Sequence, residues 1–213
     1  MAVIPFYGSD DPDLFAIERG AMDREGRVIA ALDENLPTTG TALDVGAGDG
    51  FTAERLTTRT RNVVALEPAA GMIRRDRRLA WVQGEAECLP FADASFGAAY
   101  ATWAYFFSRN WDPSPGLREL HRVVRRGGPL LIVDNLGSDE FSALSLDDMS
   151  ADTEFWVRNG FACLAIDTHF DFENMTEARA LLELFFGETG GERAALRLSF
   201  RVGLFVGRSS GCR

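Results

Sequence analysis

A glycine-rich segment near the start of the chain limits the folds and ligands open to it. Residues 42–50 read Ala-Leu-Asp-Val-Gly-Ala-Gly-Asp-Gly, so an apolar run leads into glycines at alternate positions, Gly46, Gly48 and Gly50. We predict a buried strand that ends in this turn and a helix that begins at Phe51. Glycine has no Cβ atom, so a ligand can lie against the backbone and face the N–H groups that start the helix. The segment therefore predicts a site for a nucleotide-type cofactor.

The spacing of the glycines excludes two common kinds of nucleotide site. The dinucleotide-binding pattern G-x-G-x-x-G needs its third glycine at the position of Phe51, but here that glycine comes one residue earlier, at Gly50. A phosphate-binding loop of the Walker type needs a Gly-Lys-Ser/Thr ending. The chain has no lysine, because all 22 of its basic residues are arginine. The pattern that matches is an acid, Asp44, followed by glycine at every second position.

That pattern resembles motif I of the class I S-adenosylmethionine (SAM)-dependent methyltransferases, and further segments resemble the family in the same order. They are a strand that ends on an acid (62–68), a segment like Gly-Asp-Ala-Glu-x-Leu-Pro-Phe (81–91), the fourth strand (95–101), and a helix with a Gly-Gly turn into the fifth strand (117–134). Together the segments cover roughly residues 42–135. The chain is most similar to the type 11-like, small-molecule members. The resemblance implies SAM as cofactor and S-adenosyl-L-homocysteine as its product.

The same resemblance implies an α/β fold with a Rossmann-like, doubly wound sheet of seven strands, mostly parallel with an antiparallel last strand. Short apolar strands alternate with helices over residues 41–135, which is typical of a parallel sheet covered on both faces. We expect a single SAM-binding domain over residues 1–213. Its parts are a helical cap at 1–40, the cofactor-binding core at 41–135, and a substrate-side loop with helices and the last two strands at 136–213.

Several elements are predicted outside the motifs. We expect one helix over residues 14–36, and an exposed basic run, 74–78, at the end of a helix. A Ser- and Asp-rich loop at 136–150 could lie over the pocket. The last predicted elements are a helix at 152–158, a strand at 161–172, a helix at 176–186 that ends at a group of glycines, and a strand at 196–208.

One group of residues is expected at the cofactor. Glu67 ends the second strand, where a carboxylate can accept hydrogen bonds from both hydroxyls of a ribose. The resemblance implies that Glu85 accepts from the adenine amino group and that the N–H of Ala86 reaches the ring. It also places Tyr7 and Arg19 at the amino-acid end of the cofactor. The full predicted set is Tyr7, Arg19, Asp44, Gly46, Ala47, Gly48, Gly50, Glu67, Pro68, Met72, Glu85, Ala86 and Ala101.

Simpler interpretations of these residues stay open. Asp44 could steady the turn without touching a ligand, and Glu67 could be a solvated strand end. Glu85 is one methylene longer than the Asp that is usual in the family. Arg19 could be a surface residue and Tyr7 a packing aromatic.

The chain offers few candidates for a general base. Several relatives carry two histidines after the fourth strand, where this sequence has Phe106 and Phe107. His169 shares a strand face with Asp171 near the end of the sixth strand, and this pair is the candidate base. The alternative is that the pair is exposed on an edge strand. His121 lies inside a predicted helix and is expected to be structural, and no spacing of histidines and cysteines resembles a metal site.

Aromatic residues gather after the fourth strand, next to the expected position of the methyl group. Such a lining suits a flat or apolar small molecule, although roughly half of these side chains could instead fill the core. The predicted pocket residues are Trp103, Tyr105, Phe106 and Phe107, with Trp111 nearby and with Phe170 and Phe172 approaching from the sixth strand.

The resemblance implies O-, N- or C-methylation of a small-molecule acceptor, in secondary metabolism or a quinone pathway. Two other functions stay open. One is an enzyme that uses the same fold and cofactor for cyclisation or another rearrangement, and the other is a non-catalytic SAM-binding protein.

Composition limits the partners of the chain. A net charge of −10 argues against nucleic acid, which needs a basic surface. No apolar run reaches eighteen residues and no leader is recognisable, so we expect a cytoplasmic protein without a membrane partner. The absence of lysine suggests a GC-rich bacterial genome. The sequence does not determine the oligomeric state.

Overall fold

The computed structural model describes residues 10–106 and 112–211. Three residues expected in the site, Tyr7, Phe107 and Trp111, lie outside the described residues. Among the helices of the described part, none is long and apolar enough to cross a membrane.

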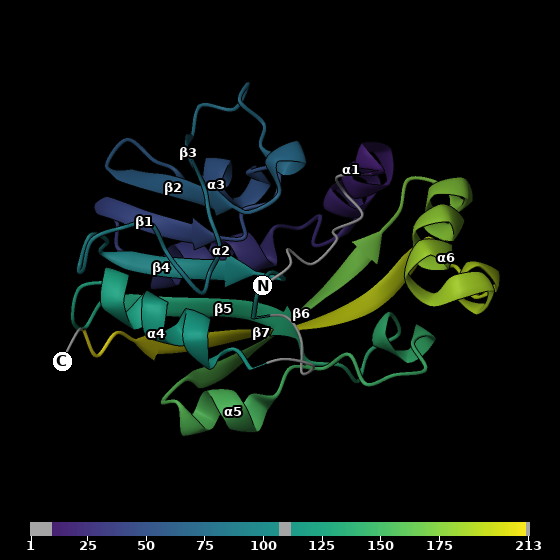
Figure 1. Cartoon of the computed structure of the whole chain (residues 1–213). Coiled ribbons are helices and arrows are strands. Elements are labelled where there is room, and N and C mark those ends of the chain that lie inside the picture. Colours follow the sequence, from purple (N-terminus) through teal and green to yellow (C-terminus); the bar gives the residue numbers. More distant parts are fainter. Residues whose placement is uncertain (1–9, 107–111, 212–213) are drawn as a thin grey trace.

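One seven-stranded sheet organises the described residues, with strand order β3-β2-β1-β4-β5-β7-β6 (Figure 1). The pairs from β3 to β5 are parallel, whereas β7 is antiparallel to both β5 and β6. This confirms the predicted fold class, including the antiparallel last strand. The elements are α1 (Pro12–Ala21), α2 (Arg27–Asn35), β1 (Gly40–Val45), α3 (Phe51–Leu56), β2 (Arg61–Glu67), η2 (Ala70–Met72), β3 (Ala80–Gln83), β4 (Ala98–Thr102), α4 (Ser114–Val123), β5 (Pro129–Asn135), η3 (Ser142–Leu144), α5 (Thr153–Arg158), β6 (Ala162–Asp171), α6 (Met175–Glu192) and β7 (Arg197–Arg208).

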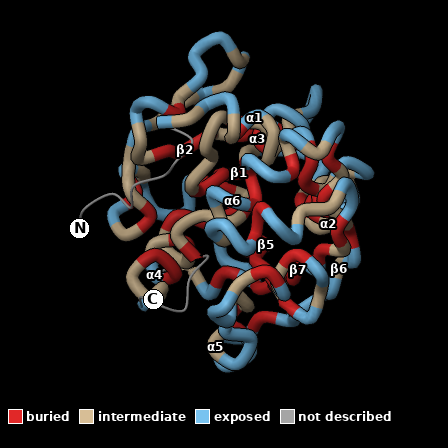
Figure 2. Tube along the Cα trace, turned by 90° about the vertical axis from the view of Figure 1, so that its right-hand side faces the viewer, coloured by how far each residue is buried: buried red, intermediate tan, exposed pale blue. Residues whose placement is uncertain are grey.

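Two apolar layers enclose the sheet. On one face α4 and α5 pack through Leu120 and Trp156, and on the other α2 and α3 pack through Leu32 and Leu56. Every residue of β5 is buried because helices cover both of its faces. Figure 2 shows the buried segments gathered along the central strands. The carboxyl ends of β1, β2, β4 and β5 are thereby held in fixed positions.

The predicted helix over residues 14–36 is wrong in one respect, because the chain leaves the helix at Met22 and begins a second one at Arg27. Asp23 and Gly26 both have positive φ, 52° and 72°. The Asp23 carboxylate accepts hydrogen bonds from the N–H groups of Arg27 (3.0 Å) and Val28 (2.8 Å), which start α2. The Asp23 carboxylate, four and five residues ahead of these free N–H groups, therefore caps the second helix where the first has ended.

Asp23 also ties this turn to the sheet, since Oδ1 accepts from the hydroxyl of Thr168 at 2.7 Å. We expect Asp23→Ala to lower the free energy of unfolding by about 1–2 kcal/mol, because the cap of α2 is lost. Urea denaturation measures the change. Glu25→Ala is the matched control, because its ion pairs with Arg27 and Arg197 are exposed to solvent and should contribute much less than the cap. Equal losses for both variants would show that the cap does not stabilise the turn.

One further prediction of secondary structure is corrected. The run 74–78 does not end a helix, because only the short turn η2 follows β2, and Arg77 pairs instead with Asp49 (2.9 Å) and Glu54 of the glycine-loop region. The helix predicted to end at 186 is confirmed, because the backbone leaves the helical conformation at Gly187, where φ is 69°. A second short helical segment follows it, and α6 as a whole extends to Glu192.

Candidate functional site

A cavity of about 460 Å³ lies at the carboxyl ends of β1, β2, β4 and β5. This is the edge where the strand order reverses, between β1 and β4, and where open α/β sheets bind their ligands. One end is formed by the glycine loop and β2. The other is formed by aromatic side chains from the second half of the chain.

The glycine loop has positive φ at Gly46, Gly48 and Gly50, but the three positions serve different purposes. A Cβ atom at Gly46 would lie 2.3 Å from the Cβ of Ala104, and one at Gly50 would lie 2.8 Å from the indole of Trp81. Close packing therefore accounts for these two. At Gly48 the nearest side-chain atoms, from Phe15 and Met72, would lie at 3.7 and 3.9 Å, which is ordinary van der Waals contact, so close packing does not account for this glycine. Of the three, Gly46 and Gly48 line the cavity, and Gly50 lies behind it.

Glu67 connects the ends of β1 and β2. Its carboxylate accepts from the N–H of Gly48 through Oε2 and from the N–H of Ala69 through Oε1, both at 2.9 Å. Burial raises the pKa of Glu67, while these two hydrogen bonds oppose the rise. The side chain is buried and lines the cavity. The interpretation of Glu67 as a solvated strand end is thus contradicted.

Arg19 reaches the cavity from the last turn of α1. Its guanidinium lies 5.2 Å from the centre of the Phe15 ring and 5.7 Å from that of Phe51. Its Nε is buried and has no hydrogen-bond partner in the part of the chain that the structure describes. Arg19 is also the only basic side chain among the described residues that line the cavity. A buried, unpaired guanidinium donor fits a carboxylate ligand.

Asp44 lies in β1 directly ahead of the glycine loop and is fully buried. Neither carboxyl oxygen has a hydrogen-bond partner among residues 10–106 and 112–211. Burial, together with the nearby charge of Glu67, raises the pKa of Asp44 to about 7, while the neighbouring Tyr100 hydroxyl and the charge of Arg19 oppose the rise. Asp44 does not line the cavity, so any effect on a ligand has to pass through the loop or through the field of its charge.

A short segment after β3 forms one wall. Glu85, Ala86 and Glu87 all line the cavity. The hydroxyl of Tyr105 donates to Glu87 at 3.2 Å. Burial, together with the charge of Glu87, raises the pKa of Tyr105 to about 12, so this phenol stays protonated near neutral pH.

The far end of the cavity is aromatic and draws on segments that are distant in sequence. The rings of Phe141 and Phe170 are stacked with centres 4.3 Å apart, and Phe200 lies 5.1 Å from each of them. Trp103 stacks on Phe200 at 6.1 Å. The remaining apolar lining residues here are Met22, Met149 and Phe185.

Trp103 occupies an unusual backbone position at the end of β4, with φ of 45°. A non-glycine residue in this region costs of order 1–3 kcal/mol, so the surroundings must hold it there. The backbone N–H of Trp103 donates to the carbonyl of Val133 at 3.1 Å, and its indole Nε1 donates to Oδ1 of Asn135 at 2.9 Å. Asn135, at the end of β5, is buried and lines the cavity.

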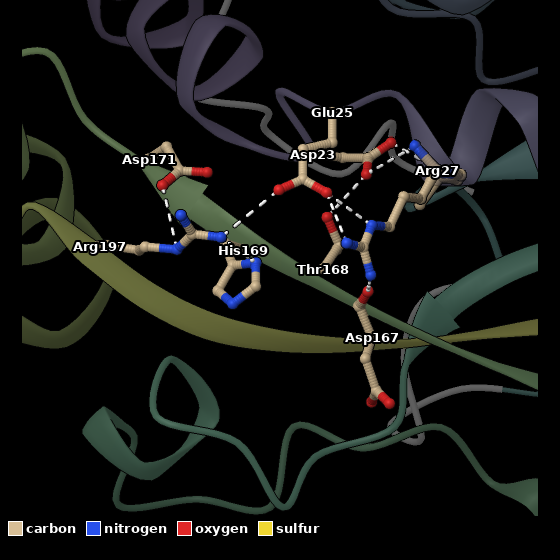
Figure 3. A network of polar contacts seen from close by, with 9 residues as sticks. Asp23, Glu25, Arg27, Asp167, Thr168, His169, Asp171 and Arg197 are labelled. Atoms are coloured by element: carbon tan, nitrogen blue, oxygen red, sulfur yellow. Dashed lines mark hydrogen bonds and ion pairs between the residues drawn. The ribbon is translucent and has the colours of Figure 1, made fainter.

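The structure does not bring His169 and Asp171 to the cavity. Alternation along β6 puts both on the face opposite Phe170, and it is Phe170 that lines the cavity. Figure 3 shows the pair around Arg197, whose Nη2 lies 3.0 Å from Nδ1 of His169 and whose Nε lies 3.4 Å from the Asp171 carboxylate. This exposed ion-pair cluster agrees with the edge-strand alternative.

The predicted site residues that the structure describes fall into two groups. Those that line the cavity are Arg19, Gly46, Ala47, Gly48, Glu67, Pro68, Glu85, Ala86, Trp103, Tyr105 and Phe170. Those that do not line it are Asp44, Gly50, Met72, Ala101, Phe106, His169, Asp171 and Phe172. Phe106 packs instead on the other side of the sheet, 5.8 Å from Trp156, and Phe172 stacks on Phe170.

The lining also includes residues that the sequence did not single out. Among them are Phe15, Asn135, Phe141, Met149, Phe185 and Phe200.

No group of three or more potential metal ligands occurs in the described residues.

Residues 43–132 match the family model described as a methyltransferase domain. A demethylmenaquinone methyltransferase from Beutenbergia cavernae is 38% identical over 97 residues, which cover 43% of this chain and 39% of that protein. Across the demethylmenaquinone methyltransferases that it matches, the chain spans 37–50% of their length.

Solved structures share the fold across most of the chain. A SAM-dependent methyltransferase from Thermotoga maritima superposes with a TM-score of 0.59 at 20% identity, covering 94% of both chains. A [4+2]-cyclase, SpnF, superposes with a TM-score of 0.57 at 18% identity, covering 87% of this chain and 82% of that one. Proteins with this fold therefore differ in chemistry.

Proposed function

Because the chain belongs to the class I SAM-dependent methyltransferases, we propose that it transfers a methyl group from SAM to a flat small-molecule acceptor held in the cavity. The observation that carries the proposal is a single cavity with two unlike ends. One end has the acid, the glycine loop and the unpaired arginine suited to SAM, and the other is an aromatic chamber. The names of the demethylmenaquinone methyltransferases among the curated relatives favour a ring-containing acceptor of the quinone type, whereas a malonyl-[acyl-carrier protein] O-methyltransferase is also among the relatives. Secondary metabolism is a second proposed setting for such an acceptor.

The residues at the glycine-loop end of the cavity have side chains and backbone groups of the kinds that can bind SAM. We assign Glu67 to the ribose hydroxyls, Glu85 and the N–H of Ala86 to adenine, and Arg19 to the carboxylate. Gly48 lines the cavity without a side chain, so the ligand can lie against the loop. The buried Nε of Arg19 has no described partner, so a ligand carboxylate can supply one. The bound cofactor would supply an electrophilic methyl group.

The chain itself contributes positioning more than acid–base chemistry. No histidine, cysteine or lysine occurs among the described lining residues, and Tyr105 is too weak an acid to be ionised near neutral pH. Of the carboxylates in the lining, Glu67 and Glu85 are assigned to the cofactor and Glu87 accepts a hydrogen bond from Tyr105. We therefore propose that the acceptor is a nucleophile that needs little help from a base, or one that arrives deprotonated. Holding two reactants in line can lower a barrier by about 7–11 kcal/mol without a base.

A second candidate is a rearrangement or cyclisation in the same cavity. The absence of a histidine from the described lining favours it, and the [4+2]-cyclase shows that the fold is compatible with such chemistry. Product mass separates the two, because methyl transfer adds one methyl group and a rearrangement adds no mass.

Calorimetric titration with SAM, S-adenosylhomocysteine and NAD in parallel tests the cofactor. We expect both adenosyl ligands to bind and NAD to give no heat, because the turn lacks the third glycine of the dinucleotide pattern. Mass spectrometry of SAM incubations with candidate ring acceptors then tests the transfer. If neither adenosyl ligand binds, the proposed function fails.

A further inference from the structure

We propose that the side-chain amide of Asn135 selects the acceptor by donating a hydrogen bond to it, so that the cavity prefers a flat, neutral ring that carries an accepting oxygen. The class includes aryl ketones, quinone-type carbonyls and aryl ethers. That such a ring compound is the methyl acceptor rests on the proposed function, whereas the preference of the cavity for binding it does not.

The orientation of the Asn135 amide follows from its partner. An indole N–H can only donate, so the atom of Asn135 that faces Nε1 of Trp103 at 2.9 Å must be the oxygen. The NH₂ group then points away from Trp103. It has no hydrogen-bond partner in the part of the chain that the structure describes. Asn135 is buried, with only 3% of its surface exposed, and it lines the cavity. Its NH₂ group therefore faces the cavity.

The apolar walls beside the Asn135 amide increase its effect on which ligands bind. Phe141, Phe170 and Phe200 form the apolar walls on one side of the chamber. A polar group in such surroundings is costly when it is left unpaired. A ring with an accepting oxygen satisfies the amide, a plain hydrocarbon leaves it unpaired, and a ligand that offers only donors opposes it.

The position of the pair also suits an acceptor. Trp103 is followed by Ala104, whose Cβ packs against Gly46 of the glycine loop. The amide therefore lies where the aromatic end of the cavity meets the loop. The positive φ of Trp103 is part of this arrangement, since it directs the backbone from β4 towards the loop while the indole holds Asn135.

Three matched probes test the preference: 1-indanone, which carries a carbonyl, indane, the same ring system without oxygen, and 1-aminoindane, which carries an ammonium group. Affinities are measured by calorimetry at pH 8, with and without S-adenosylhomocysteine. In Asn135→Asp the second oxygen replaces the NH₂ group while the other still accepts from Trp103. We expect the affinity for 1-indanone relative to indane to fall by about 2- to 12-fold, and that for 1-aminoindane to rise by a similar factor.

A second variant and a control variant test whether the shift in affinity comes from the Asn135 amide. Trp103→Phe leaves Asn135 in place but removes the donor that orients it, so we expect a smaller shift in the same directions. Asn62→Asp makes the same change at an exposed position of β2 and should leave all three affinities unchanged. Unchanged ratios in folded Asn135→Asp, or no binding of any probe to the unaltered protein, would overturn the inference.

The outcomes separate this inference from the proposed function. If S-adenosylhomocysteine does not bind but Asn135→Asp still shifts the relative affinities as expected, the proposed methyl transfer is contradicted and the role of Asn135 in ligand binding is supported. If S-adenosylhomocysteine binds and the relative affinities for the three probes do not change in Asn135→Asp, the role of Asn135 is contradicted and the proposed function is not.

Discussion

Replacing Glu67 with alanine is expected to weaken the binding of SAM and S-adenosylhomocysteine by about 10- to 150-fold, because charge-assisted hydrogen bonds contribute about 1.5–3 kcal/mol. In the structure the same carboxylate also accepts from the N–H groups of Gly48 and Ala69. The loss therefore combines the missing contact to the ribose with a less fixed glycine loop. Calorimetry on the folded variant measures it.

Glu67→Gln separates these two contributions. The amide keeps the length of the side chain and one accepting oxygen, so it can hold one of the two N–H groups but carries no charge. We expect its affinity to fall between those of the original protein and Glu67→Ala. A Glu67→Ala protein that is folded and binds both ligands as tightly as before would remove Glu67 from the cofactor site.

The residues at the glycine-loop end of the cavity, which we propose binds the cofactor, could be predicted to lie together because each motif is local in sequence. Each motif pairs a strand end with the residue that follows it, and parallel strands bring those ends to one edge of the sheet. Gly46, Gly48, Glu67, Glu85 and their neighbours therefore meet once the strand order is known. For two of the glycines the cause lies in residues distant in sequence. A Cβ atom at Gly50 would clash with Trp81 of β3, and one at Gly46 would clash with Ala104, which follows β4.

The acceptor end could not be predicted in the same way. Phe141, Phe185 and Phe200 come from a loop, a helix and the last strand, and nothing in their own sequence separates a lining phenylalanine from a core one. Asn135 lies one residue beyond the predicted fifth strand, and only its contact with Trp103 reveals a role. His169 and Asp171 satisfied the strand alternation, yet they face away from the cavity. Alternation groups residues by face without saying which face holds the ligand.

Asp44 is expected to make the stability of the protein depend on pH. Its carboxyl is fully buried, and its pKa rises from an ordinary value of 3.8 to about 7 on folding. Between these values the folded protein holds a proton that the unfolded chain releases, so stability decreases as pH rises from about 4 to about 7. One pKa unit corresponds to about 1.36 kcal/mol, so the full loss above pH 7 is on the order of 4 kcal/mol.

Asp44→Asn removes the ionisation while keeping the shape of the side chain. We expect the variant to resemble the original protein at pH 4 and to be more stable by up to about 4 kcal/mol at pH 8, measured by urea denaturation across this range. Asp167→Asn, in which the altered carboxylate is 81% exposed, is the control and should change stability by no more than about 0.5 kcal/mol at any pH. Parallel pH curves for the original protein and Asp44→Asn would mean that the buried carboxyl has the same pKa in both states. In that case a hydrogen-bond donor next to the carboxyl compensates for the cost of burial and keeps the pKa of Asp44 near its ordinary value.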